Sequence, residues 1–222
     1  MKKLFFCCLM IFVISGISGA QEIPSGIGFE ETLIATGVNF KDYAELYIYG
    51  IDVREMVVKR VDTDGDIYEK PVDDLISSDI AFELNLAFSE QLRKVLPVAQ
   101  PQEQFKGAAG LKGKNALMLD IKLSYERKVE DVGLLTQLIF KKEEKVVSEG
   151  GLTIACSFRD ADSGKVVLKL EQTLVFDIEN DEQPFGTEKE QEELKSLIKI
   201  WAMRAARILA NKRGEEYKNP EL

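Results

Sequence analysis

The sequence of 222 residues contains no histidine. Histidine is the usual general base near neutral pH and a common zinc ligand, so its absence excludes Ser-His-Asp and Cys-His catalytic arrangements and histidine-ligated zinc. Ser-Lys pairs and paired carboxylates remain possible chemistries, but no serine or acidic residue stands in a recognisable catalytic motif. We therefore expect a protein that is not an enzyme and that needs no cofactor.

Cysteine is also scarce, and two of the three cysteines, Cys7 and Cys8, lie inside an apolar run near the start of the chain. A lipoprotein would instead carry a cysteine directly after such a run and its small residues. Cys156 is the third cysteine, and a single thiol cannot form an intrachain disulfide. The fold is therefore expected to depend on its core alone.

The first 20 residues have the three parts of a signal peptide. Two lysines precede the apolar run Leu4–Ile14, and small residues including Ser18 and Ala20 precede the polar Gln21. The run is shorter than the roughly 20 residues that span a bilayer. We predict cleavage after Ala20 and a periplasmic or secreted chain without a transmembrane segment; the alternative is an uncleaved anchor.

Basic residues are fewer than acidic residues in the chain beyond residue 20. The chain beyond residue 20 has 27 basic and 38 acidic residues, a formal charge of −11. Such a surface repels phosphate backbones and anionic lipid headgroups, because binding to nucleic acid depends on the opposite sign of charge. We therefore expect no nucleic-acid partner.

Three segments before residue 100 carry secondary-structure signals. Residues 43–58 are rich in Tyr, Ile and Val on both faces, which predicts a strand near the centre of a sheet. Residues 60–74 are polar and predict a loop. Residues 77–79 offer capping oxygens to a helix of about five turns that ends at Pro97. Its apolar stripe consists of Ile80, Leu84, Ala87, Phe88, Leu92, Val95 and Leu96.

The second half of the chain predicts mainly strands. Over residues 117–125 one set of alternate positions is apolar throughout, and the other holds Met118, Asp120, Lys122 and Ser124. This period of two indicates one face in the core and one in water. Residues 151–159 and 166–178 predict an antiparallel hairpin with a short turn that contains Asp and Gly. An apolar stretch and a charged tip within residues 132–147 indicate another hairpin. A final helix is predicted over residues 188–212, with the stripe Leu194, Leu197, Ile198, Trp201, Ala205, Ile208 and Leu209.

This order of elements predicts an α+β fold, with a mostly antiparallel sheet of four to five strands and two helices packed on one face. We divide the chain into a signal peptide (1–20), a lead-in segment (21–42), a single α+β domain (43–213) and a C-terminal tail (214–222). Residues 100–115 form a glycine-rich connection within the domain.

Three features are candidate sites. Asp62, Asp64 and Asp66 resemble the start of a calcium loop, but an EF-hand needs glycine at its sixth position and glutamate at its twelfth, which here are other residues. A solvated acidic turn is the favoured interpretation. Cys156 shares a strand face with apolar residues, so we expect a buried thiol rather than a reactive one. Trp201 lies on the stripe of the last helix, which favours core packing over a ligand platform.

Several short segments resemble the DUF3313 family of proteobacterial envelope proteins. They are residues 39–43 (NFKDY), residues 151–154 (GLTI), residues 158–167 (FRDADSGKVV) and residues 200–202 (IWA). The resemblance covers most of residues 36–210. It implies an envelope protein, often lipid-anchored in that family, with no catalytic residues to carry over.

Taken together, the sequence favours an exported interaction or assembly module that binds another envelope protein. The alternative is a carrier of a small apolar ligand held between sheet and helices, which would need a cavity there. A histidine-free hydrolase is the least favoured hypothesis. The sequence gives no indication of the oligomeric state.

Overall fold

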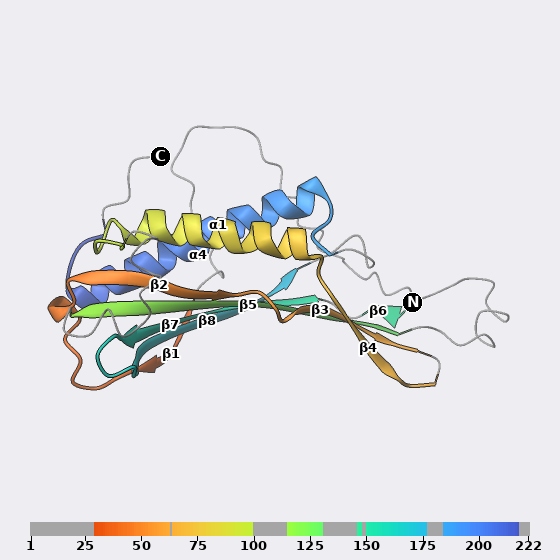
Figure 1. Ribbon diagram of the computed structural model, residues 1–222, viewed down its shortest axis with the longest axis horizontal. Coiled ribbons are helices and arrows are strands. Elements are labelled where there is room, and N and C mark those ends of the chain that lie inside the picture. The colour runs from red at the N-terminus through yellow and green to blue at the C-terminus, as the bar shows by residue number, and fades with distance from the viewer. Residues whose placement is uncertain are drawn as a thin grey trace, which may run out of the picture.

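The computed structural model describes residues 29–62, 64–99, 115–130, 146–147, 150–176 and 184–217. These residues form one sheet of eight strands with two helices, α1 (Asp74–Leu92) and α4 (Glu188–Arg213), on the same face (Figure 1). The predicted α+β class is confirmed, and the strand number exceeds the four to five that were predicted. The predicted signal peptide and most of the 100–115 connection and the 132–147 hairpin lie outside the described residues.

The centre of the sheet is antiparallel and consists of β5 (Ala116–Glu130), β7 (Gly150–Asp160) and β8 (Val166–Phe176). Ile121 pairs with Cys156, and Cys156 pairs with Leu170, so these three side chains share the face that the helices cover. The predicted hairpin is confirmed over its described residues, 151–176. The alternation predicted over residues 117–125 is confirmed except at Met118, which was expected to face water and is buried. Fully buried residues of β5 on this face are Leu117, Leu119, Leu123, Tyr125 and Val129.

The predicted strand over residues 43–58 is two strands in the structure. β2 (Glu45–Asp52) and β3 (Met56–Val61) lie end to end along one edge of β5, and both run parallel to it. The prediction of a central position was wrong for β2, whose only named neighbour in the described chain is β5. β2 is apolar on both faces although it lies at an edge, because Tyr47 is covered on the open face of the sheet by a small cluster that contains Met118 and Ala161.

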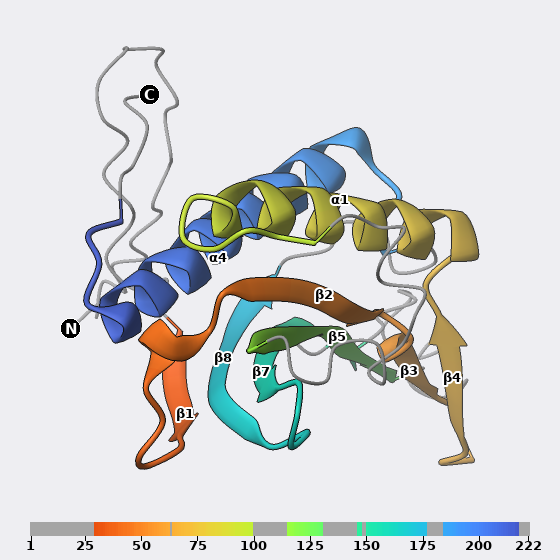
Figure 2. The same cartoon turned by 60° about the vertical axis from the view of Figure 1, so that its left-hand side comes forward.

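Two edge strands were not anticipated. β1 (Glu30–Ile34) pairs with β8 inside the predicted lead-in, and β4 (Ile67–Pro71) pairs with β3 inside the predicted 60–74 loop. They flank the sheet on opposite sides (Figure 2). β4 is exposed along its whole length, including Ile67 and Tyr68, so this segment is an edge strand rather than a loop. A two-residue strand, β6 (Val146–Val147), pairs with the far end of β5.

Both helices begin at side-chain caps, but α1 begins earlier than predicted. Asp73 is its N-cap and accepts a hydrogen bond of 2.8 Å from the N–H of Leu75. Ser78, predicted to be a cap, lies inside the helix, where its hydroxyl donates to the carbonyl of Asp74. α4 matches its prediction closely. It starts with a capping box of Thr187 and Glu190 and ends at Gly214 in the left-handed conformation.

The core lies between the helices and the covered sheet face. Trp201 and Cys156 are fully buried in it, as predicted. Burial raises the pKa of the Cys156 thiol above its ordinary value. Within the described residues, no helix is both long enough and apolar enough to cross a bilayer.

Candidate functional site

The solvent face of α1 carries large apolar side chains. Leu75, Phe82 and Leu86 are 78%, 66% and 53% exposed, although the opposite face of the same helix is fully packed in the core. Their spacing of seven and four residues places them on one line along the helix, because a helix turns about 100° per residue. Single exposed apolar residues are ordinary, whereas an aligned set of three is a candidate contact surface. We call Leu75, Phe82 and Leu86 the outer stripe.

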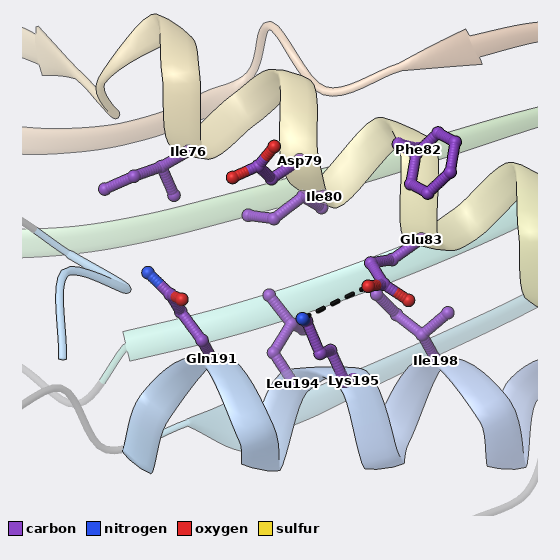
Figure 3. Close-up of a pocket in the computed structure, with 9 residues that line it drawn as sticks. All are labelled: Ile76, Asp79, Ile80, Phe82, Glu83, Gln191, Leu194, Lys195 and Ile198. Carbon is purple, nitrogen blue, oxygen red and sulfur yellow. Dashed lines mark ion pairs between the residues drawn. The ribbon is translucent and has the colours of Figure 1, made fainter. Parts of the chain in front are cut away.

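A groove adjoins the outer stripe, between α1 and α4. Figure 3 shows side chains from both helices that point toward one another across it. Its floor is apolar, since Ile80, Leu194 and Ile198 are almost completely buried, whereas Asp79 and Gln191 on its sides are exposed. The groove therefore opens to solvent.

One ion pair bridges the groove. Nζ of Lys195 on α4 lies 3.1 Å from Oε1 of Glu83 on α1, and their side chains are 47% and 25% exposed. Pairs with this degree of exposure contribute roughly 0–1 kcal/mol to stability. The pair can therefore open when another molecule enters the groove. Its two charges would then be available to polar groups of that molecule.

The size of the groove limits what it can hold. Its volume is about 210 Å³. Pockets for small molecules generally measure about 300–1,000 Å³. An apolar side chain from another protein, inserted beside the outer stripe, fits this volume better than a free ligand does.

A second hollow lies at the end of the sheet near β1 and the β7–β8 turn, with a volume of about 740 Å³. It brings together two of the segments that carry the DUF3313 resemblance, residues 39–43 and residues 158–167. The contact is made by Tyr43, whose hydroxyl donates a hydrogen bond to the Asp160 carboxylate. Burial and the neighbouring Asp160 raise the pKa of Tyr43 to about 12.

The groups around this hollow are engaged in holding the fold together. Asp160 Oδ1 accepts hydrogen bonds from the N–H and the hydroxyl of Ser163, at 2.7 and 2.6 Å. Burial acts to raise the pKa of Asp160, but these hydrogen bonds outweigh it and lower the pKa. Arg213, at the end of α4, donates to the carbonyls of Phe40 and Tyr43 at 2.8 Å each. The resemblance motifs thus form a structural corner that joins the sheet to α4.

The acidic triplet of the sequence lies at the tip of the β3–β4 hairpin. Asp62 Oδ1 accepts hydrogen bonds from the backbone N–H groups of Asp64 and Asp66, at 3.0 and 2.9 Å. The carboxylate of Asp62 therefore organises the turn. Across the described part of the chain, the structure gathers no group of three acidic or cysteine ligands suited to a metal ion.

The outer stripe was missed in the sequence, although a signal for it exists. The predicted helix was defined by its buried stripe and the charged residues beside that stripe. A count of apolar residues around the complete helix shows Leu75, Phe82 and Leu86 on the side opposite Leu84 and Phe88. A helix that is apolar on two sides, with only one side in the core, indicates a surface available to a partner.

No family model matches this sequence, so the DUF3313 resemblance remains a prediction. No curated protein matches it either. Among solved structures, a homolog of neuraminyllactose-binding hemagglutinin from Helicobacter pylori is 14% identical, with a TM-score of 0.43, over 78% of this chain and 88% of its own. The PelC dodecamer from Paraburkholderia phytofirmans is 11% identical, with a TM-score of 0.35, over 78% of this chain and 92% of its own. A minor lipoprotein from Acinetobacter baumannii is 14% identical, with a TM-score of 0.30, over 77% and 95%. At these TM-scores, the likenesses carry no argument about function.

Proposed function

We propose that this chain is a non-catalytic interaction or assembly module of the cell envelope, and that it binds a partner protein through the outer stripe and the adjoining groove. The observation that carries the proposal is the line of Leu75, Phe82 and Leu86 on the solvent side of α1. Burying one such side chain is worth about 1.5–3 kcal/mol relative to leaving it in water. A partner that covers all three, and places a side chain in the groove, gains a specific apolar contact.

The rival function, transport of a small apolar ligand, requires space between the sheet and the helices. In the described core that region is occupied by fully buried side chains such as Leu84, Phe88 and Trp201. The groove lies instead on the solvent side of the helices and is small. The larger hollow, of about 740 Å³, lies at the end of the sheet near β1 and not between the sheet and the helices. These observations favour a protein partner over a carried ligand.

Placement in the envelope rests on the sequence. The lysines, apolar run and small residues of the first 20 positions have the order of an export signal, and the DUF3313 resemblance points to the same compartment. An acidic surface also suits a protein that avoids nucleic acids and anionic lipid headgroups.

A photoreactive amino acid placed at Leu86 in the exported protein tests the proposal. Irradiation of intact cells is expected to produce a protein adduct, because Leu86 lies on the outer stripe. The matched control places the same group at Thr173, an exposed position on the uncovered sheet face. Equal adducts at both positions, or none at Leu86, would remove the outer stripe as the binding surface.

A further inference from the structure

The two ends of α1 carry opposite charges next to the outer stripe. Asp74 and Asp79 are exposed near the N-terminus of the helix, and at its C-terminus the exposed Arg93 and Lys94 outnumber the exposed Glu90. Arg93 follows Leu86 by seven residues, so it continues the line of Leu75, Phe82 and Leu86. The face thus runs from an acidic end, through an apolar middle, to a basic end.

This arrangement is complementary to itself when two copies of the helix lie antiparallel. A twofold axis across the middle of α1 places Phe82 of each copy opposite Leu86 of the other. The same axis places Arg93 of each copy opposite Leu75 of the other, between the flanking Asp74 and Asp79. Both apolar and charged contacts are therefore made twice, as an isologous interface requires.

The alternatives fit less well. A parallel pair of helices would place like charges beside one another at both ends, which is destabilising. Antiparallel packing also sets the positive end of one helix dipole beside the negative end of the other. A different protein would need a surface with a basic end, an apolar middle and an acidic end to match this face. A second copy of α1, placed antiparallel, already has that order.

We infer that the protein seated on the outer stripe is a second copy of this chain, bound through antiparallel α1 helices. The inference rests on the proposed function of the same surface and specifies its partner. It makes the chain an assembly module whose smallest unit is a symmetric dimer. Each copy then covers the apolar face that the other leaves exposed.

A charge-swap experiment tests the inference on protein purified from the periplasm, with sedimentation velocity over a range of concentrations. We expect reversible dimers for the parent. Arg93→Glu alone sets a third acidic side chain beside Asp74 and Asp79 of the other copy, and Asp79→Arg alone sets a second basic side chain beside Arg93. Each variant alone is expected to weaken association at least about tenfold. An equimolar mixture is expected to restore it, because the mixed dimer has opposite charges at both ends.

Unchanged melting temperatures of both variants, measured at a protein concentration too low for association, serve as the folding control, since both positions are exposed. A parent that stays monomeric at all concentrations would overturn the dimer. So would a dimer that neither charge reversal weakens, because it would use another face. If the parent is monomeric but the photoreactive group at Leu86 captures a different protein, the proposed function stands and only the second copy is excluded. If Leu86 captures nothing, both proposals fail.

Discussion

The indole Nε1 of Trp201 donates a hydrogen bond of 2.7 Å to Oε1 of Gln172, and this contact joins α4 to β8 inside the core. Trp201 is fully buried and Gln172 is 6% exposed. A polar side chain on the covered face of a strand would be costly without a partner. Each of these residues therefore satisfies the other, and the pair fixes how α4 sits on the sheet.

Replacing both partners of this pair is expected to cost less than the sum of the two single replacements. Trp201→Phe leaves the Gln172 amide oxygen unsatisfied, and Gln172→Leu leaves the indole N–H unsatisfied, so each should lower the free energy of unfolding by about 1–3 kcal/mol. The double variant should lose less than the sum of the two single losses, by about 0.5–3 kcal/mol. Urea unfolding of the four proteins measures this coupling. Strict additivity would show that the hydrogen bond contributes nothing.

Gly150 is required by close packing at the start of β7. A Cβ at this position would lie 2.6 Å from Cε2 of Tyr125, whose ring covers the glycine. Gly150→Ala is therefore expected to lower the free energy of unfolding by about 1–3 kcal/mol or more, through overpacking. Gly151→Ala is the matched control, because its Cβ would meet only the carbonyl oxygen of Glu126, at 4.0 Å. Equal losses in the two variants would contradict this explanation.

Much of the fold follows from local patterns that the sequence displays. The period of two identified β5, and the turn residues at Asp160 and Gly164 identified the β7–β8 hairpin. The capped ends of α4 identified its length. The parallel placement of β2 and β3 along β5 could not be predicted, because pairing between distant strands leaves no local signal. β1 and β4 were missed since short edge strands resemble loops in composition.

The raised pKa of Tyr43 predicts a loss of stability at alkaline pH. Its pKa is about 12 in the folded chain against the ordinary value of 10.0, so the folded state retains the proton that the unfolded state loses. The contribution is fully present below pH 10 and is lost as the pH rises through about 12. In this window, the unfolding free energy of the parent should fall by up to about 1.4 kcal/mol per pH unit more steeply than that of Tyr43→Phe. Parallel curves would place Tyr43 outside the corner that joins it to Asp160.

Cys156 is expected to be inert in the folded protein. Its side chain is fully buried on β7, and burial raises its thiol pKa, so neither access nor the thiolate form favours reaction. Labelling with a maleimide reagent should be slow in buffer and fast in denaturant. Fast labelling of the folded protein would mean that β7 opens readily or that the thiol has a role of its own.

The candidate site was less predictable than the core. The candidates visible in the sequence were Asp62, Asp64 and Asp66, Cys156 and Trp201, and each of them was predicted to have a structural role. The surface that the structure offers instead, the outer stripe, consists of ordinary helical residues without a motif. Its significance depends on which side of α1 the core covers and on where α4 lies, and only the folded chain determines both.

Alanine substitutions of two phenylalanines on opposite sides of α1 distinguish an effect on folding from an effect on binding. Phe88 is fully buried, and Phe82 is 66% exposed. Phe88→Ala is expected to cost about 3–5 kcal/mol of unfolding free energy. Phe82→Ala should stay within about 0.5 kcal/mol of the parent when measured at a protein concentration too low for association.

The most direct test of the central claim is the yield of the photoreactive adduct at Leu86 in the Phe82→Ala variant. The outer stripe binds its partner as one surface, so the yield should fall about tenfold or more, although the protein remains folded. A yield equal to that of the parent would contradict the claim that the solvent face of α1 is where this protein binds.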